Sequence, residues 1–340
     1  MRLTTFLQCA LLALLAGCPP PEAPSSDADA GWREPVSPLQ DGGTSSDAGR
    51  IDAGDLGDAG HPADGGSPFC ALSPGSRDGG SVIRILSGNL SSGTQQSYDP
   101  GHGLRILQGL LPDVVLLEEF KVGTGSASEA AAFASAALGA PSCWFREAGA
   151  TLPNGVLSRY PILEAGEWDD VQVSDRDFAY ARIDVPGPRD LWAVSVHLLT
   201  TGATNRNLEA SALVALIQQH VPAGDLLVVG GDFNTDSSSE ACLTTLSQVV
   251  STSGPYPADG AGNGNTNAPR SKPYDRILPD ADLLALQVPV AIGAQNFAAG
   301  LVFDSRVFTP LSAVTPVLLG DSGAPNMQHM AVVKDFLLLP

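Results

Sequence analysis

The amino-acid sequence predicts an α/β (α+β) domain, and three observations support this class. From Ser81 onward, short apolar runs of strand length alternate with longer stretches of helical periodicity. Hydrophobic residues make up 43% of the chain, which is enough to build a full core. The 340 residues exceed the roughly 250 residues that such a domain often needs, so other segments are expected beside it.

The expected strands are apolar runs bounded by polar or turn-forming residues. In chain order they are VIRIL at 82–86, VVLL at 114–117, FAYARIDV at 178–185, LWAVSV at 191–196 and LLVV at 226–229. Between them lie three stretches with helical spacing, GLRILQGLL at 103–111, SEAAAFASAAL at 128–138 and NRNLEASALVALIQQHV at 205–221. Alternation of the two periods along one chain predicts sheets that are covered by helices.

The first 18 residues have the pattern of a secretory signal. One Arg precedes an apolar run that ends in small residues and is too short to span a bilayer. Its end, Leu15 to Cys18, resembles the bacterial lipoprotein box, which implies acylation of Cys18 and anchoring in the cell envelope. The alternative is an ordinary cleaved signal and a freely secreted protein.

Residues 19–67 are rich in Pro, Asp, Ala and Gly, and Asp-Ala-Gly recurs at Asp47, Asp52 and Asp58. Such a segment lacks the large apolar side chains that would offset the entropy of ordering. We expect a disordered tether that joins the anchored Cys18 to a folded domain at 68–340.

The folded domain is acidic in its own right. The whole chain has 37 acidic and 18 Lys or Arg residues, and residues 1–67 account for ten and three of these. This balance argues against tight non-specific binding to nucleic acid, which relies on basic contacts to phosphates. It is compatible with a metal-assisted phosphodiesterase, because bound cations neutralise both the carboxylates and the phosphate.

Three cysteines remain in the domain, Cys70, Cys143 and Cys242. In an oxidising compartment, one disulfide and one free thiol is the simplest expectation, and the pairing stays open. Neither Cys-x-x-Cys nor His-Glu-x-x-His occurs, so the sequence gives no case for a structural zinc or a zinc protease.

Polar side chains follow the expected strands directly. They are Asn89, Glu119, His197, Asp232 and Asn234. Strand ends often form the floor of one cleft in an α/β sheet, so we expect these residues to converge. In LLVVGGDFNTD, a spacing of two would point Asp232 and Asn234 the same way in an extended chain. The alternative is a strand followed by an Asx turn.

The segment GGDFN resembles the central motif of the endonuclease/exonuclease/phosphatase superfamily, which includes deoxyribonucleases, abasic-site endonucleases, neutral sphingomyelinases and inositol-phosphate phosphatases. Further matching segments occur in the expected order between Ser81 and Phe336. They are SGNL, PDVVLLEEF, NGVLSRYPI, VSVHL, KPYDRIL and MQHMAVV. The resemblance implies a four-layer α/β/β/α sandwich of two packed mixed sheets and hydrolysis of a phosphoester with Mg²⁺ or Mn²⁺.

The resemblance also implies roles for the site residues. Asn89 and Glu119 would hold the metal, as their hard oxygens suit Mg²⁺. His329 would take a proton from the attacking water, and Asp275 would orient it. His197 would donate a hydrogen bond or a proton to the phosphate or the leaving oxygen. Asp232 and Asn234 complete the predicted catalytic set, and Glu118 should point to the opposite face from Glu119.

One position departs from the pattern. The resemblance expects Asp before the final His, and the chain has Gln328, which keeps an oxygen for a metal but loses the charge. This substitution leaves open a weakly active or non-catalytic surface binding protein. Asp321, seven residues earlier, could supply a carboxylate instead.

The long loop from Ser253 to Lys272 is rich in Gly and Asn. Tyr256, Arg270 and Lys272 could grip a substrate phosphate or base, because loops over a scaffold often hold specificity. The alternative is a solvated connector without contact to substrate.

We therefore expect a secreted, lipid-anchored, metal-dependent phosphodiesterase or nuclease that acts as a monomer on a phosphoester, including nucleic acid. A phospholipid or sphingolipid phosphodiesterase is the alternative within the same chemistry. It would need an exposed apolar docking loop, which an aromatic content of 6% does not suggest.

Overall fold

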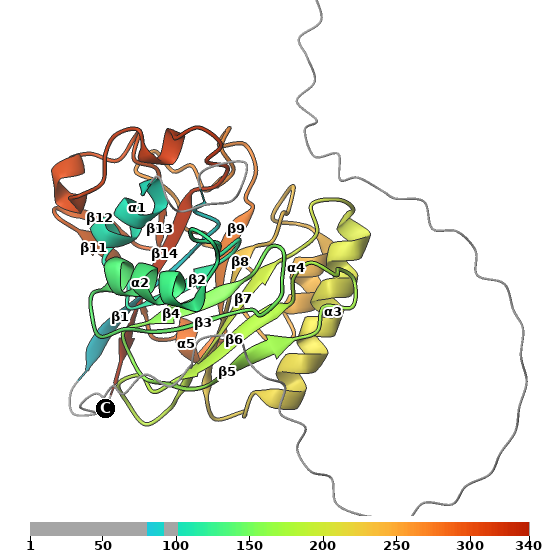
Figure 1. The fold of residues 1–340 in the computed structure, drawn as a ribbon. Helices are drawn as coiled ribbons and strands as arrows, with labels where there is room; N and C mark the ends of the chain where they lie inside the picture. The colour runs from blue at the N-terminus through green and yellow to red at the C-terminus, as the bar shows by residue number, and fades with distance from the viewer. Residues whose placement is uncertain (1–79, 92–100, 340) are drawn as a thin grey trace, which may run out of the picture. The chain divides into compact units, whose positions relative to one another are not determined.

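Strand β1, Ser81–Gly88, sits inside a sheet, because its second half, from Ile85 onward, is buried although successive residues face opposite ways. It opens the part of the chain that the computed structural model describes, which is residues 80–91 and 101–339 (Figure 1). The expected signal peptide, Cys18 and the tether lie outside these residues.

The sheet around β1 has seven strands. β1 pairs in parallel with β2, Val114–Leu117, and antiparallel with β14, Ala331–Leu338. The strand order is β10-β14-β1-β2-β4-β3, and β13 also pairs with β14. The remaining bounds are β3 Cys143–Arg146, β4 Gly155–Ser158, β10 Gln287–Val288 and β13 Leu301–Phe303.

A second sheet has five strands in simple sequence order, β5 to β9. β7 and β8 are parallel, and the other pairs are antiparallel. The bounds are β5 Ile162–Trp168, β6 Phe178–Ile183, β7 Leu191–His197, β8 Leu226–Asp232 and β9 Asp275–Pro279. A small separate hairpin joins β11, Val290–Ile292, to β12, Gln295–Phe297.

The helices cover the outer faces of the two sheets. Helix α2 begins at a capping box in which Ser126 and Glu129 satisfy each other's backbone N–H groups. The bounds are α1 His102–Leu110, α2 Ala127–Leu138, α3 Ala203–His220, α4 Ala241–Leu246 and α5 Ala281–Leu284, with 3₁₀ turns η1 Leu311–Val314 and η2 Asp321–Gly323. Figure 1 shows α1 and α2 on one side of the sheets and α3 and α4 on the other.

Three apolar clusters confirm the expected four layers. One packs α1 and α2 against the seven-stranded sheet, and another packs α3 and α4 against the five-stranded sheet. The third lies between the sheets and contains, among others, Ile85, Leu116, Val228 and Phe336. Each sheet is therefore buried on both faces, which explains why its strands read as continuous apolar runs rather than as alternating patterns.

Cys143 is disulfide-bonded, and Cys242 on α4 is a free, buried thiol whose pKa burial raises to about 11. This matches the expectation of both a disulfide and a free thiol. Within residues 80–91 and 101–339, none of the helices is long and apolar enough to cross a bilayer.

Candidate active site at the shared edge of the two sheets

Three of the expected residues form one row across the five-stranded sheet. His197 pairs with Asp232 in the parallel β7–β8 ladder, and Asp232 pairs with Asp275 in the antiparallel β8–β9 ladder. β9 runs opposite to β8, so its first residue lies at the same edge as the last residue of β8. Positions 35 and 43 residues apart in the sequence are thereby direct neighbours, with Asp232 in the middle of the row.

The two glycines before Asp232 allow close packing of β8, Gly230 against the other sheet and Gly231 against the neighbouring strand β7. A Cβ on Gly230 would lie 2.5 Å from Cδ1 of Leu116, which belongs to β2. Gly231 has a φ of 140°, and its Cβ would lie 2.0 Å from the carbonyl oxygen of Val196. Glycine meets both the close contacts and the positive φ, so the Gly-Gly pair determines where Asp232 lies at the end of β8.

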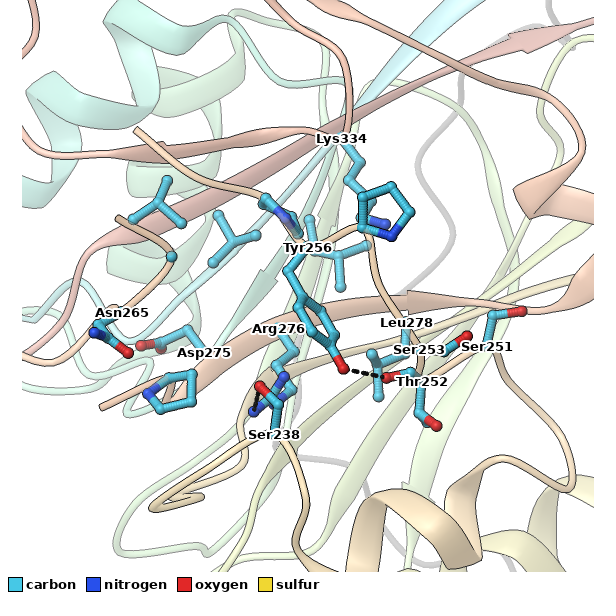
Figure 2. A pocket seen from close by; sticks show the side chains of 17 residues that line it. Ser238, Ser251, Thr252, Ser253, Tyr256, Asn265, Asp275, Arg276, Leu278 and Lys334 are labelled. Atoms are coloured by element: carbon cyan, nitrogen blue, oxygen red, sulfur yellow. Dashed lines mark hydrogen bonds between the residues drawn. The ribbon is translucent and has the colours of Figure 1, made fainter. Parts of the chain in front are cut away.

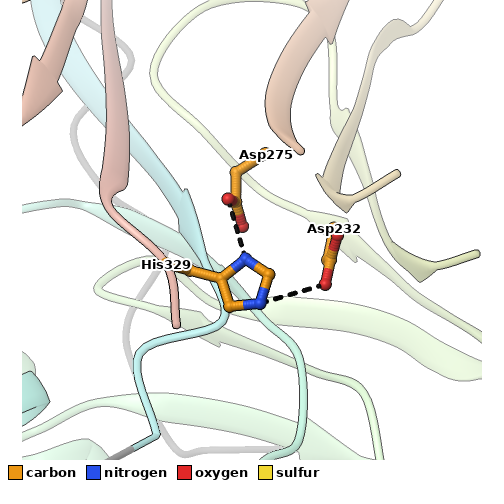
Figure 3. Close-up of side chains that lie close together, drawn as sticks. All are labelled: Asp232, Asp275 and His329. Carbon is orange, nitrogen blue, oxygen red and sulfur yellow. Dashed lines mark hydrogen bonds and ion pairs between the residues drawn. The ribbon is translucent and has the colours of Figure 1, made fainter. Parts of the chain in front are cut away.

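His329 joins this row from the other sheet, just before β14. Its Nδ1 lies 3.0 Å from Oδ2 of Asp275, and its Nε2 lies 3.4 Å from Oδ2 of Asp232. Figure 3 shows the imidazole between the two carboxylates. Thr266 fixes the strand beside it, because its hydroxyl accepts a hydrogen bond from the backbone N–H of Asp275 at 2.7 Å.

Burial and charge shift the pKa values of this trio. Burial lowers the pKa of His329, but the carboxylates of Asp275 and Asp232 raise it more, to about 10. Burial raises the pKa of Asp232 to about 7, against the opposing charge of His329. Without a cation, the two carboxylates therefore favour the protonated form of the imidazole.

His197 is held from behind by a residue that the sequence did not single out. Arg176 Nε donates to the carbonyl oxygen of His197 at 2.5 Å, and a second guanidinium nitrogen donates to that of Leu198 at 3.4 Å. Burial, together with the charges of Arg176 and His329, keeps the pKa of His197 well below its usual range. The neutral ring directs Nε2 to Oδ2 of Asp232 at 3.5 Å, so His197 is suited to donate a hydrogen bond rather than to act as an imidazolium acid.

Asn234 follows Asp232 in a turn. Its backbone N–H donates to Oδ1 of Asp232 at 2.9 Å, and its φ is 49°. Its side-chain amide donates to the carbonyl oxygen of Leu198 at 2.9 Å. The Asx turn and a position in the site, which were alternatives in the sequence analysis, therefore occur together. The turn places the side chain of Asn234 against the loop that follows His197.

A second group lies beside the trio at the end of β1 and β2. Asn89 Nδ2 donates to Oε1 of Glu119 at 2.7 Å, and the hydroxyl of Ser91 lies 3.2 Å from the other carboxylate oxygen. The backbone N–H of Asn89 donates to Oδ1 of Asp275 at 3.5 Å, which links the two groups. Glu119 is partly exposed and has a φ of 51°, so the chain turns sharply to present it.

Glu118 points the other way, as expected. It is fully buried, accepts a hydrogen bond from the hydroxyl of Ser195 at 2.8 Å, and has a pKa raised well above its usual range by burial. It therefore packs beneath the site rather than lining it.

The site offers donors for a hard divalent cation. One oxygen each from Asp232 and Asp275 and a ring nitrogen of His329 lie within 4.8 Å of one another, and Glu119 with Asn89 adds oxygen donors beside them. Carboxylate and amide oxygens are the ligands that Mg²⁺ prefers. The residues present therefore fit a divalent cation.

Gln328 does not enter this cluster through a contact that the described residues show. Its side chain is exposed, and its backbone carbonyl accepts from the N–H of Ala268 at 2.7 Å. Asp321 does not replace it, because its carboxylate is bound to the guanidinium of Arg105 at 2.5 Å.

The three expected substrate-binding residues have separate positions. Arg270 differs most from the predicted substrate-binding role. Its guanidinium binds Asp259 and Asp304 at 2.8 Å each and so holds the loop itself in place. Lys272 is exposed and paired with Asp236 at 2.5 Å. Tyr256 is 42% exposed and lines a cavity behind the site. The guanidinium of Arg270 is therefore engaged within the protein and is not positioned to bind a substrate.

The comparisons with known proteins agree with this fold. The family model described as the endonuclease/exonuclease/phosphatase family matches residues 89–297. A solved structure from Bacteroides vulgatus, described as endonuclease/exonuclease/phosphatase, is similar at 15% identity and a TM-score of 0.52 over 76% of this chain and 100% of that chain.

Two other solved structures are also similar. A functionally unknown conserved protein from Enterococcus faecalis V583 aligns at 10% identity and a TM-score of 0.50, over 76% of this chain and 100% of that one. An endonuclease/exonuclease/phosphatase from Beutenbergia cavernae aligns at 18% identity and a TM-score of 0.49, over 76% and 72%. No curated protein matches the sequence. At these identities the structural likeness concerns the fold.

Proposed function

Because the chain belongs to the endonuclease/exonuclease/phosphatase family, we propose that it is a divalent-metal-dependent phosphodiesterase of the nuclease type. Members of this family are typically metal-dependent phosphoester hydrolases. The observation that carries the proposal is the placement of His329 between Asp275 and Asp232, with Glu119 and Asn89 alongside.

Glu119 and Asn89, with Asp232 beside them, would hold the Mg²⁺ or Mn²⁺ ion. When bound, the cation supplies Lewis-acid polarisation of the phosphoester and neutralises its charge. Gln328 is left out of this set because its exposed side chain makes no contact with the cluster among the described residues.

The residues of the trio handle the proton of the attacking water. Asp232 and His329 share a buried position at the centre of the site, and a carboxylate oxygen of Asp232 accepts the proton while His329 stays an imidazolium. Asp275 binds Nδ1 of His329, which holds the imidazole so that Nε2 faces the reaction. The charged imidazolium then stabilises the negative charge that develops on the phosphoryl oxygens.

His197 and Asn234 position the substrate. As a neutral ring, His197 donates a hydrogen bond to a phosphoryl oxygen, and Asn234 holds the loop beyond His197 in place through Leu198. The buried floor of the site excludes water from these groups and strengthens their electrostatic effect.

The decisive experiment is an activity panel with the purified chain in Mg²⁺ or Mn²⁺. DNA, RNA and an aryl phosphodiester serve as substrates, and Asp232→Ala is the inactive variant. Hydrolysis of at least one substrate that Asp232→Ala abolishes supports the proposal. If none of the three is hydrolysed, the nuclease and general phosphodiesterase assignment has to be given up.

A lipid phosphodiester is the second candidate, and one observation favours it. Val307, Leu318 and Leu319 are 57%, 56% and 64% exposed, and all three lie between β13 and β14 in the segment that leads to His329. Exposed apolar side chains of this kind can insert into a membrane surface. Release of a phosphorylated headgroup from liposomes, reduced in a Leu318→Ser, Leu319→Ser double variant, would favour the lipid over nucleic acid.

We further propose that the protein is exported and anchored through acylated Cys18. The support is the Leu-Ala-Gly-Cys sequence after a signal-like apolar run. Fractionation of expressing bacteria tests this, with a lipid-labelled band expected in the membrane fraction. A Cys18→Ser variant that stays equally membrane-bound would contradict it.

A further inference from the structure

A cavity of about 140 Å³ lies behind the site, between the open edge of the five-stranded sheet and strands β13 and β14. β9 is an edge strand, so the cavity reaches side chains from both of its faces, including Asp275 and its neighbour Arg276. The segment 251–257 covers it, and Figure 2 shows Lys334, Tyr256 and Arg276 among the lining side chains.

Two buried bases line this cavity without an acidic partner. Arg276 donates to neutral oxygens only, the hydroxyl of Thr235 at 3.0 Å and weaker contacts to the 237–238 segment. Lys334 Nζ donates to the side-chain oxygen of Gln287 at 3.0 Å. Among the described residues, neither base forms an ion pair with a carboxylate.

This arrangement is unusual within the same molecule. Four Lys or Arg residues in the described part of the chain are at most 7% exposed. Arg206 is paired with Glu240 at 2.8 Å and Arg176 with Asp175 at 3.1 Å. The two that lack an acid, Arg276 and Lys334, are the two that line the cavity, although acidic residues outnumber basic ones two to one in the chain.

The acids near the cavity are already engaged. Asp275 binds His329 at 3.0 Å, Glu240 binds Arg206, and Asp335, next to Lys334 in β14, binds Arg84 on the other face of the sheet. Burying a cation without a counter-charge is costly, and burial lowers the pKa of Lys334 to about 8. An anion in the cavity would remove this cost.

The remaining lining suits an oxyanion as well. The polar part of the lining offers hydroxyl donors from Ser238, Ser251, Thr252 and Ser253. The ring of Tyr256 lies 5.9 Å from the guanidinium carbon of Arg276 and is 42% exposed, so it stands at the entrance. At about 10–15 Å³ for each water, the cavity has room for a tetrahedral oxyanion together with bound water.

We propose that this cavity is a binding site for a phosphate group, held by Arg276 and Lys334 and separate from the hydrolytic cluster. The phosphate is either free inorganic phosphate or a second phosphoryl group of the substrate. The second source rests on the proposed phosphodiesterase function, because Asp275 is shared by the cavity wall and the hydrolytic site.

The first test measures phosphate binding by the purified full chain in the presence of a chelator, so that no divalent cation contributes. Isothermal titration with inorganic phosphate should give one site, and the Tm should rise with phosphate concentration. Lys334→Met and Arg276→Gln should each weaken binding by roughly ten- to a hundredfold, the range for loss of a charged hydrogen bond. Lys334→Arg and Arg276→Lys are the matched variants that retain the charge and should bind more tightly than the neutral ones.

Asp232→Ala keeps this test independent of the hydrolase assignment. It removes the centre of the proposed metal site and should leave phosphate binding in chelator unchanged. Absence of binding by the wild-type chain, or equal affinity in wild type, Lys334→Met and Arg276→Gln, would overturn the phosphate site whether or not the protein is a hydrolase.

A second arm distinguishes the two sources of phosphate. The KM for a simple aryl phosphodiester is compared with that for a nucleotide aryl ester that carries an additional phosphate. If Lys334→Met raises only the second KM, the cavity holds a substrate phosphoryl group. If it weakens phosphate binding and changes neither KM, the cavity holds free phosphate.

Discussion

Asp232 and Asp275 face each other directly across the β8–β9 ladder, and the imidazole of His329 lies between their carboxylates. Like charges in such a pair repel each other, so the ladder would be weakened without the intervening cation. The imidazolium from the other sheet offsets this repulsion. The same contact that completes the site thus also holds the two sheets together at this edge.

We predict that Asp275→Asn reduces phosphodiester hydrolysis by about 10²–10⁴-fold. The amide removes the charge that raises the pKa of His329 and leaves Nδ1 only a neutral acceptor. Steady-state kinetics measure the loss, and NMR titration of His329 should show a lowered pKa. Asp282→Asn, on the exposed ion pair with Arg189, is the control and should retain activity. Full activity in Asp275→Asn would exclude the proposed role.

We predict that Arg176→Met lowers kcat by roughly ten- to a hundredfold and leaves the fold intact. The guanidinium holds the carbonyl oxygens of His197 and Leu198, and its charge lowers the pKa of His197. The variant should therefore also raise the pKa of His197 in an NMR titration. Arg176→Lys keeps the charge and should shift that pKa less. An unchanged pKa in both variants would show that Arg176 only packs.

We predict that Gln328→Asp raises the affinity for Mg²⁺ by up to about fivefold, because an exposed charge contributes roughly 0–1 kcal/mol. Gln328→Asn adds no charge and should leave the affinity unchanged. Isothermal titration with Mg²⁺ measures both variants. Identical affinities in all three chains would show that Gln328 is an adequate replacement, and a wild-type chain that binds no divalent cation would instead favour a non-catalytic binding protein.

We predict that Arg270→Met destabilises the domain by about 3–5 kcal/mol, as expected when one partner of a buried ion pair is removed. The change leaves the carboxylates of Asp259 and Asp304 without their shared guanidinium. Urea unfolding measures the free energy, and Lys272→Met is the comparison because its pair with Asp236 is exposed. Equal stability of the two variants would restore Arg270 as a candidate for substrate binding.

We predict a pH-dependent contribution to stability from Glu209. Burial, with the neighbouring Asp170, raises its pKa to about 8 while its oxygens accept the N–H of Leu199. Between its usual pKa and about 8, the folded chain keeps a proton that the unfolded chain releases, so stability falls as the pH rises through this window. The slope is up to about 1.4 kcal/mol per pH unit. Glu209→Gln should reduce the slope, and parallel curves for the two chains would contradict the prediction.

Much of the fold could be predicted from the sequence where strands are apolar and long enough. The run 114–117 coincides with β2, and the helical periods at 128–138 and 205–221 match α2 and α3 to within one or two residues. Strands β3, β4, β5, β9 and β14 were not among the predicted strands, and neither were the short strands β10 to β13. Strands β10 to β13 have two or three residues each, which is too short to show an alternating pattern. The pairing of β10 and β13 also depends on β14, which lies far away in the chain.

The sequence predicted which residues form the site better than it predicted their chemical roles. The strand-end positions identified Asn89, Glu119, His197 and Asp232, and the structure brings them to one edge. The roles of Arg176 and Arg270 could not be predicted from the sequence, because an Arg in a loop has no periodic pattern that indicates which residues it contacts. Only the fold decides whether its guanidinium meets a carbonyl, a carboxylate or solvent.

The origin of the site in both sheets also affects how activity and unfolding are related. His329 lies just before β14 of one sheet, and Asp232 and Asp275 belong to the other sheet. A shift of one sheet against its partner by even part of a residue repeat would separate these groups while each sheet kept its own hydrogen bonds. Loss of catalysis on heating should therefore precede loss of secondary structure. Catalytic activity would then measure how well the two sheets are aligned.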